Sequence, residues 1–438
     1  MRSLVAVLAA LTIAAPSRGA AQAAPAGLTL AAAVARAAEG APGVAAAGYR
    51  VEEARARVGQ ARARLLPSLS VAGTWLNRSE NLAAFGLSIP EFSNFVPPFD
   101  NLDGRVRLSQ TVFDWSGWQH LRAEGYQTSG SQADRTAAVE AGARAAALAY
   151  LRAVRAASLL AARQADADIA AQLLSLAEAQ VQAGVSAPLD VTRARTQLVA
   201  AQGALIVARN QRQKADIDLA LALGADPATT WRLADTLTGD LGASVAPADT
   251  AAALALALER RPDLAAEAAR GARAETERRA IAAERLPRID FAADYGPNGN
   301  TLPSALATQD IAVVVSIPLL DGFRREARSA EQRAVARESD SRTGELRRQI
   351  AAQVRSALLD LGSGMEQHGV AAQRLALAIE ELDEARERFA SGVAGNIDVI
   401  TAQSSLNVAR DAEIDSRYAT AAARVGLAFA AGVAETIH

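Results

Sequence analysis

Residues 184–191 read Gly184-Val185-Ser186-Ala187-Pro188-Leu189-Asp190-Val191 and separate two long helical patterns. Gly184 supplies the left-handed backbone residue that commonly ends a helix, and Pro188 suits the first turn of the helix that follows. The segment therefore predicts the tight tip of a helix–turn–helix hairpin that runs from about Gly117 to Leu223.

The ascending arm of this hairpin carries a heptad repeat of unusually small residues. Positions sampled every 3.5 residues are mostly alanine, and the descending arm continues the pattern. Such a seam predicts a left-handed coiled coil whose backbones pack closely. The ascending seam positions are Gly142, Ala146, Ala149, Ala153, Ala156, Leu160, Arg163, Ala167, Ala170, Leu174, Ala177 and Val181.

The same hairpin recurs 208 residues later. Its tip reads Gly392-Val393-Ala394-Gly395-Asn396-Ile397-Asp398-Val399, and its seam matches the first without a gap. A chain with this internal match is a tandem duplication. We expect a single folded unit over 24–438 made of two repeats, at 28–226 and 249–434, with a linker at 226–247 and helical hairpins at 117–223 and 322–432.

Composition narrows the class of protein. Hydrophobic residues make up 50% of the 438 residues but aromatic residues only 4%, so most apolar side chains are small. The net charge of −2 gives no electrostatic basis for binding nucleic acid. Because the sequence has no cysteine, it can form no disulfide and carry no lipid-modified N-terminal cysteine.

No pattern for catalysis or for a cofactor is present. The sequence has two methionines and three histidines, and His368 falls on the second seam, where a packing role is expected. We find no transition-metal site, nucleophile–base pair or phosphate-binding loop. The sequence therefore predicts a protein that is not an enzyme and that binds no cofactor or metal.

The first residues indicate export. Arg2 precedes an apolar run from Leu4 to Ala15, and small residues follow, ending in Ala21-Gln22-Ala23. A charged start, a short apolar core and an A-x-A site are typical of a cleaved signal peptide, which we place at 1–23. No later segment offers ~20 uninterrupted apolar residues, the length that a transmembrane helix needs.

Four segments within 66–113 and 287–318 switch from a helical period to a period of two. Each has about 9–11 residues with one apolar and one polar face, which is typical of outer-membrane barrel strands. Trp75 and Tyr295 lie near strand ends, where an aromatic girdle would sit. A soluble two-sheet sandwich predicts the same alternation, but charges on the polar faces favour a wet barrel lumen. These charged residues are Asp103, Arg105, Arg107, Arg288, Asp290, Asp294 and Asp310.

Four strands cannot close a membrane barrel, because the smallest has about eight and open edges are not stable in hydrocarbon. Several copies must therefore each contribute four strands. A dimer would give eight strands and a filled interior, whereas a trimer gives twelve and room for a channel. The predicted fold is mainly α with a small β part: long antiparallel coiled-coil hairpins, forming an α-barrel in the trimer, plus four transmembrane β-strands per protomer.

The duplication, the signal peptide, the paired strands and the tips together resemble the TolC-like outer-membrane efflux protein family over essentially the whole mature chain. The most specific marks are the two tips and the Leu-Pro pairs that begin strands, Leu66-Pro67 and Leu286-Pro287. The resemblance implies a homotrimer with a twelve-stranded barrel among outer-membrane lipids and a helical tunnel extending into the periplasm. It also implies docking to a periplasmic adaptor (membrane fusion protein) and to an inner-membrane pump of the RND or ABC type.

Exposed apolar side chains at the tips are the candidate adaptor contact, because they bury nothing otherwise. The tip residues in this set are Gly184, Val185, Leu189, Gly392, Val393 and Ile397.

Asp190 and Asp398 each lie in the first turn of a helix, where the dipole stabilises an acid. As an alternative or additional role, six such carboxylates per trimer would form an aperture that favours cations. Some family members close this aperture with an arginine and a further acid, at positions that look like Ala394 and Thr401 here. The sequence therefore does not predict that gate.

We expect the chain to be a passive outer-membrane exit duct for small molecules in a tripartite efflux pump, opened by relaxation of the inner hairpin. Type I protein secretion through the same duct is the alternative within transport. A periplasmic coiled-coil scaffold is the alternative from another class.

Overall fold

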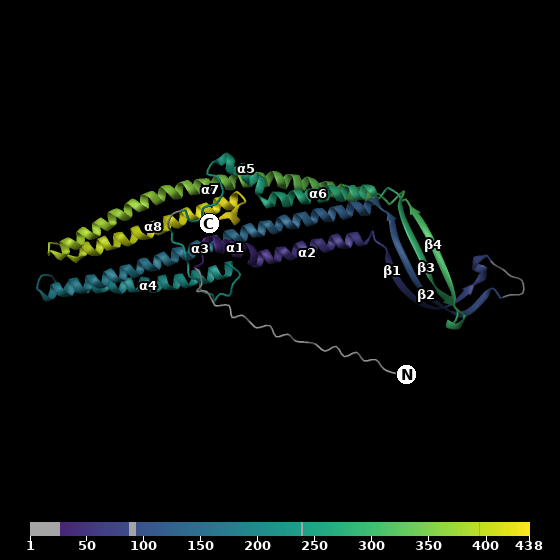
Figure 1. Cartoon of the computed structure of the whole chain (residues 1–438), viewed down its shortest axis with the longest axis horizontal. Coiled ribbons are helices and arrows are strands. Elements are labelled where there is room, and N and C mark those ends of the chain that lie inside the picture. Colours follow the sequence, from purple (N-terminus) through teal and green to yellow (C-terminus); the bar gives the residue numbers. More distant parts are fainter. Residues whose placement is uncertain (1–26, 87–92, 238–239, 394) are drawn as a thin grey trace, which may run out of the picture.

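The computed structural model describes residues 27–86, 93–237, 240–393 and 395–438, so the predicted signal peptide and Ala394 lie outside the described residues. The molecule is elongated, with helices along most of its length and a four-stranded sheet at one end (Figure 1). Its helices are α1 Leu30–Gly40, α2 Pro42–Ala63, α3 Trp115–Gln182, α4 Pro188–Ala222, α5 Thr250–Arg260, α6 Pro262–Ala283, α7 Arg324–Ala390 and α8 Asn396–Ala430, with short 3-10 helices η1 Leu82–Phe85, η2 Leu302–Ser304 and η3 Ala434–Thr436.

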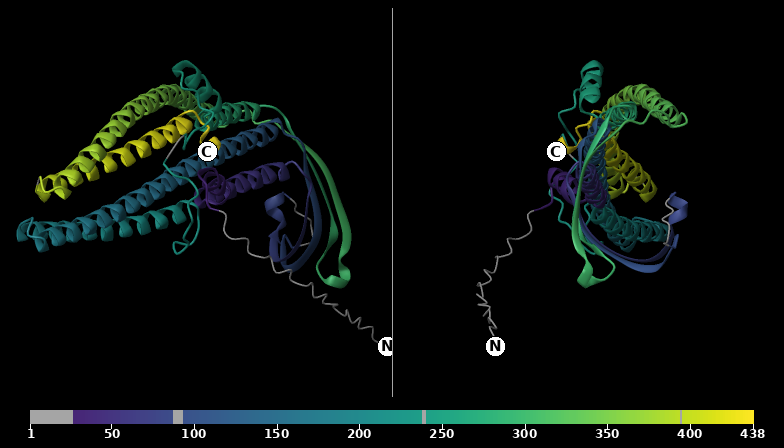
Figure 2. Two further views of the ribbon diagram at one scale, coloured as in Figure 1. Left: turned by 60° about the vertical axis from the view of Figure 1, so that its left-hand side comes forward. Right: turned by 90° about the vertical axis from the view of Figure 1, so that its right-hand side faces the viewer.

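Two long hairpins, α3–α4 and α7–α8, lie side by side (Figures 1 and 2). Every predicted seam position in both ascending arms is buried or half-buried, which confirms the heptad seam. The tip glycines have the left-handed backbone that their positions require, with φ of 73° at Gly184 and 72° at Gly392. Pro188 begins α4, as expected of a proline at the first helical position.

The order α1–α2–β1–β2–α3–α4 is repeated as α5–α6–β3–β4–α7–α8. In each copy the descending helix ends beside the break between the two short helices. A Cβ on Gly224 would lie 2.7 Å from the carbonyl oxygen of Gly40, and one on Gly432 would lie 3.2 Å from the backbone of Arg260. Both glycines also have positive φ, so the two copies use the same close-packed joint.

One antiparallel sheet holds the four strands in the order β1-β2-β3-β4. They are β1 Ser68–Asn81, β2 Phe95–Phe113, β3 Arg288–Gly299 and β4 Leu306–Ser316. β1 has 14 residues and β2 has 19, more than the expected 9–11. Their pairing continues past Trp75↔Leu102 to Asn81↔Phe95, where the run 77–81 of β1 is polar throughout and does not alternate in hydropathy. Backbone pairing can extend a hairpin beyond the segment that side-chain patterning marks.

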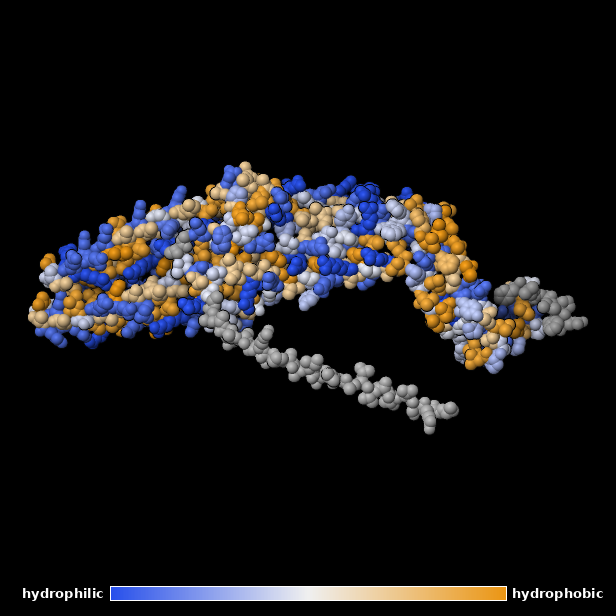
Figure 3. All heavy atoms as spheres, in the orientation of Figure 1, coloured by the Kyte–Doolittle hydropathy of each residue, from blue (hydrophilic) through white to orange (hydrophobic). Residues whose placement is uncertain are grey.

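The sheet is open within one chain. Among the described residues, β1 pairs with β2 alone and β4 pairs with β3 alone, so two strand edges carry unpaired backbone groups. The sheet curves away from the helices (Figure 2), and apolar residues cover much of its visible face (Figure 3). One stretch of α3 is long and apolar enough to cross a membrane, as the core helix of a bundle often is, and 44% of that stretch is buried by its neighbours.

Candidate functional site

The hairpin tips form the end of the molecule farthest from the sheet (Figure 1). Val185, Leu189, Val393 and Ile397 are each at least half exposed there. Gly184 and Gly392 make the turns, and a side chain on Gly184 would meet open space. The predicted tip residues therefore form an apolar surface that nothing in the described chain covers.

The two tips are bonded to each other, which the sequence did not predict. The fully buried Asn396 side chain donates a hydrogen bond of 2.7 Å from Nδ2 to the carbonyl oxygen of Asp190. Gln180 donates one of 2.9 Å in the opposite direction, from Nε2 to the carbonyl oxygen of Phe389. An asparagine at the start of α8, where the first repeat has Pro188, was the available signal.

The two candidate aperture acids differ in environment. Asp190 is only 9% exposed, and its Oδ1 lies 3.6 Å from the guanidinium of Arg193 one helical turn away. Asp398 is exposed, and within the described chain it makes no ion pair. The Thr401 hydroxyl bonds the carbonyl of Ile397 in its own helix, so it forms no link across the tips.

Farther from the tips, a buried network of charged residues links the two hairpins. Asp166 of α3, with a side chain that is 3% exposed, pairs at 2.8 Å with Arg163 and at 2.9 Å with Arg410 of α8. Arg163 also pairs with Asp411, and Arg155 pairs with Asp415 at 2.6 Å. Arg163 was expected only as a seam residue. Its role as a cross-link depends on the rotation of α3 against α8, which the sequence period does not give.

The seven predicted lumen charges lie on one face of the sheet. The Arg105 guanidinium donates to Asp103 at 2.8 Å and to Asp294 at 2.5 Å, and it lies 3.6 Å from Asp310. Arg107 lies 3.9 Å from Asp294.

Nearer the helices, Asp290 pairs with Arg288 at 2.9 Å and accepts a bond of 2.9 Å from Thr111. The charges therefore form two ladders. Each combines a pair within one strand, Arg105 with Asp103 or Asp290 with Arg288, with a contact to a neighbouring strand, which is favourable on a sheet surface.

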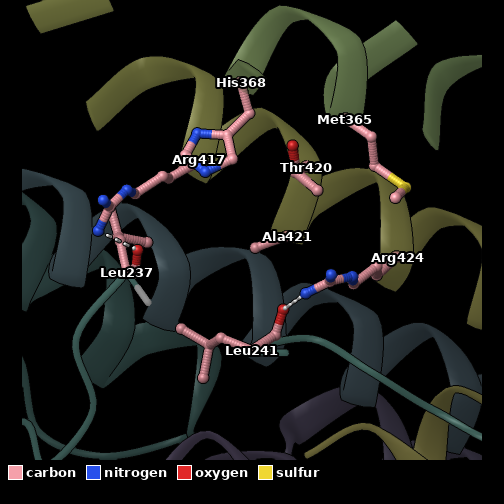
Figure 4. Close-up of a pocket in the computed structure, with 8 residues that line it drawn as sticks. All are labelled: Leu237, Leu241, Met365, His368, Arg417, Thr420, Ala421 and Arg424. Atoms are coloured by element: carbon pink, nitrogen blue, oxygen red, sulfur yellow. Dashed lines mark hydrogen bonds between the residues drawn. The ribbon is translucent and has the colours of Figure 1, made fainter. Parts of the chain in front are cut away.

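A hollow of about 300 Å³ lies between the linker, α7 and α8 (Figure 4). Its arginines hold the linker in place: Arg417 bonds the carbonyl of Leu237 at 3.2 Å and Arg424 that of Leu241 at 3.3 Å. His368 Nδ1 lies 3.4 Å from the Ser416 hydroxyl, consistent with the expected packing role. Within the described residues no cluster of potential metal ligands occurs.

Comparison with known proteins identifies the family that has this fold. The model of the family described as "Outer membrane efflux protein" matches residues 33–225 and 253–433. Pyoverdine export outer membrane protein OpmQ of Pseudomonas putida is 26% identical over 402 residues, covering 89% of this chain and 82% of OpmQ. Protein CyaE of Bordetella pertussis is 28% identical over 254 residues, which is 57% of this chain and about half, 53%, of CyaE.

Solved structures share the fold. The outer membrane channel CmeC of Campylobacter jejuni superposes with a TM-score of 0.78 at 16% identity, covering 92% of this chain and 86% of CmeC. The open state of the MtrE outer membrane channel of Neisseria gonorrhoeae gives 0.75 at 18% identity, covering 92% and 89%. These likenesses confirm a mainly helical fold with a four-stranded antiparallel sheet. The chain belongs to the outer membrane efflux protein family, the TolC-like channels of the outer membrane, and it is a channel rather than an enzyme.

Proposed function

We propose that three copies of this chain form a passive duct through the outer membrane for small molecules exported by a tripartite pump. The observation that carries this proposal is the open sheet. Its free edges at β1 and β4 and its apolar outer face are not stable alone in lipid. Three copies would pair β4 of each with β1 of the next and give twelve strands, with the Arg105 and Asp290 ladders facing water in the lumen.

The helices supply the second part of the proposal. The outward faces of α4 and α7 carry exposed apolar residues, including Val199, Ile206, Leu359 and Leu377, which neighbouring copies would cover. The hairpins then form a tunnel about 100 Å long, from 68 residues at 1.5 Å each in α3. Opening by relaxation of the α7–α8 hairpin has to overcome the bonds of Asp166 to Arg410.

The partners proposed are a periplasmic adaptor at the tips and an inner-membrane pump, of the RND or ABC type, that supplies the energy. The apolar tip surface supports the adaptor contact, since exposed apolar patches commonly mark protein interfaces. Export of small molecules is favoured over protein secretion because OpmQ, matched along most of its length, is named for export of pyoverdine.

Bilayer recordings test the duct. The purified full-length protein should give discrete conductance steps in planar lipid bilayers, and cells lacking it should accumulate a small-molecule pump substrate. A chain that stays in the soluble periplasmic fraction and gives no steps would favour the scaffold alternative. Loss of protein export with unchanged small-molecule export would favour type I secretion.

Cross-linking tests the tips. Val185→Glu with Val393→Glu should abolish cross-linking to the cognate adaptor, because two carboxylates would be buried in an apolar contact. Val245→Glu, in the exposed linker between the two repeats and far from the tips, is the control. Adaptor cross-linking that survives the double change would remove the tips from the contact.

A further inference from the structure

A hollow of about 810 Å³ lies at the base of the sheet, where α2 and α3 meet β1 and β2 (Figure 1). Arg288 and Asp290 line it, so it opens on the polar face of the sheet that carries the lumen ladders. A copy joined at the edge of β1 would lie beside that strand and not over its polar face. In the proposed duct the hollow therefore stays open to the lumen, with the size of a small-molecule site.

The charged side chains that line this hollow are not balanced. Asp290 pairs with Arg288 at 2.9 Å, and Asp114 accepts a hydrogen bond of 2.9 Å from the Gly117 amide. Arg64, the residue that follows α2, also lines the hollow and is exposed. Its side chain makes no ion pair or hydrogen bond with the described residues. Both acids of the hollow therefore have partners, and this guanidinium has none.

His120 of α3 is a further base in the hollow. Its Nδ1 lies 2.8 Å from Glu277 of α6, and this hydrogen bond raises the pKa of the ring and favours its charged form. The second ring nitrogen, Nε2, makes no hydrogen bond with the described residues and is a donor in the charged ring. The hollow thus offers two cationic donors that a bound anion can use.

The second repeat shows a carboxylate at the corresponding place. α2 and α6 each have 22 residues and begin at a proline, so the residues that follow them, Arg64 and Glu284, correspond. His120 corresponds to Arg328 through the 208-residue repeat of the hairpins. Nη1 of Arg328 lies 2.7 Å and 3.0 Å from the two carboxylate oxygens of Glu284. The first repeat has two bases at these positions and no carboxylate between them.

The helix dipole does not account for the arginine. A cation is favourable at the C-terminal end of a helix and an acid is not, yet α6 has Glu284 at the position of Arg64. Arg62 in the last turn of α2 already places a cation at that end. The dipole therefore does not require a second one.

A neighbouring copy does not supply the missing acid. In the proposed trimer β4 of the next copy pairs with β1, so the start of its α7 lies nearest to Arg64. Asp321 there pairs with Arg325 of its own chain at 2.9 Å. Glu326 pairs with Arg285 of its own chain at 2.6 Å. Both carboxylates are therefore engaged before the copies meet.

We propose that the hollow binds the carboxylate of a small organic anion that passes through the duct, at the place that corresponds to the Glu284 carboxylate. The Arg64 guanidinium holds a planar oxyanion through two parallel hydrogen bonds, and His120 adds a third donor. A site open to water binds weakly, and conduction requires a ligand that leaves again. The assignment rests on the proposed duct and makes small organic acids the favoured class of cargo.

Fluorine NMR of the ligand tests the site. The probe is para-trifluoromethylbenzoate, added to the full-length protein in a nonionic detergent, and para-trifluoromethylbenzamidine is the cation of the same shape. The benzoate signal should broaden saturably, and the benzamidine signal should not. Arg64→Glu recreates the acid–base pair of the second repeat and should weaken benzoate binding roughly tenfold. Arg64→Lys should restore most of it.

Arg62→Glu is the matched control, because it makes the same change of charge two residues away and outside the hollow. It should bind benzoate as the unchanged protein does. Equal binding by the unchanged protein and Arg64→Glu would overturn the site, and so would equal weakening in Arg64→Glu and Arg62→Glu.

Planar-bilayer recordings of the same preparation separate the site from the duct. Discrete conductance steps from a protein that does not broaden the benzoate signal would remove the site and leave the duct. Saturable, Arg64-dependent binding by a protein that gives no steps would keep the oxyanion site and remove the duct, and with it the assignment to cargo.

Discussion

The two hairpin tips have nearly the same sequence motif and different chemistry. The first tip buries its acid, Asp190, beside Arg193 and beneath the side chain of Asn396. The second tip leaves Asp398 in solvent. One of the differences between the two motifs, Asn396 where the first repeat has Pro188, lets the second hairpin donate a hydrogen bond to the first. Equivalent positions of the two repeats therefore have different roles: Asn396 holds the tips together, and Asp398 exposes a charge to solvent.

The two hairpins also differ in this way farther from the tips. Asp166 of α3 forms the buried link to α8, whereas the corresponding residue of α7 is the exposed Arg374. The first ascending helix thus holds the two hairpins together. The second offers its outward face to solvent or to another copy. Four experiments separate these roles.

The largest effect is expected from Asp166→Ala. It leaves the guanidinium group of Arg410 without its partner and removes one of the two partners of Arg163, at a cost of about 3 kcal/mol. Hydrogen–deuterium exchange near Arg410 should accelerate on the order of a hundredfold. Asp168→Ala, which removes an exposed acid bonded to Gln164, is the control. Equal acceleration in both variants would show that the network does not hold the hairpins together.

Asn396→Ala should have the next largest effect. It removes the bond to the Asp190 carbonyl and loosens both tips by about 1 kcal/mol. Amide exchange in the first turns of α4 and α8 should rise roughly fivefold. Pro188→Ala changes the equivalent position without removing a bond between the tips, and it should leave α8 unchanged. Similar exchange in the two variants would contradict the division of roles between the tips.

A third test uses two corresponding ion pairs, one to α6 and one to the residue that follows it. His120 of α3 lies 2.8 Å from Glu277, and Arg328 of α7 lies 2.7 Å from Glu284. Glu277 raises the pKa of His120 against the opposing effect of burial. This pair therefore contributes its stability fully below the unfolded pKa of about 6.5, and the contribution is lost as pH rises through the folded pKa.

The pair is partly exposed, so the effect should be below about 1 kcal/mol. Between pH 5 and 8.5 the Tm of the detergent-solubilised protein should fall more than that of His120→Arg, which keeps its charge. Parallel pH profiles for the two proteins would mean that the His120 pair adds nothing.

The smallest effect concerns ion preference. Asp398→Asn should lower the cation-to-anion permeability ratio roughly twofold, or about 0.4 kcal/mol, because this acid is exposed at the tip. Asp190→Asn should change it less, since Arg193 already lies beside that carboxylate. Reversal potentials in a KCl gradient give both ratios. A larger effect of Asp190→Asn would reverse our assignment.

Local periodicity accounts for what could be predicted from the sequence. The heptad period places Ala153 in the seam, and the alternation of apolar and polar residues places Val106 in its strand. Turn chemistry, and not a period, places Gly184 at the tip. The features that could not be predicted from the sequence depend on contacts between segments that are distant in the chain. The bonds of Asp166 and Asn396 depend on how one hairpin is rotated against the other. The spacing of residues within a helix does not specify that rotation.

Strand length and the left-handed backbone of Phe323 were missed for related reasons. Pairing of Asn81 with Phe95 depends on the backbone of the partner strand and not on hydropathy. The positive φ of Phe323 follows from how Asp321 caps α7, where it accepts a bond of 3.1 Å from the Arg325 amide. The Asp-Gly-Phe sequence marks a turn but does not say which residue adopts the left-handed backbone.

Native mass spectrometry of the full-length protein released from outer membranes tests the central claim most directly, because one chain leaves the edges of β1 and β4 unpaired. The account predicts a complex of three chains that stays intact when lipid is stripped away. A single chain, stable in lipid with both edges free, would contradict it.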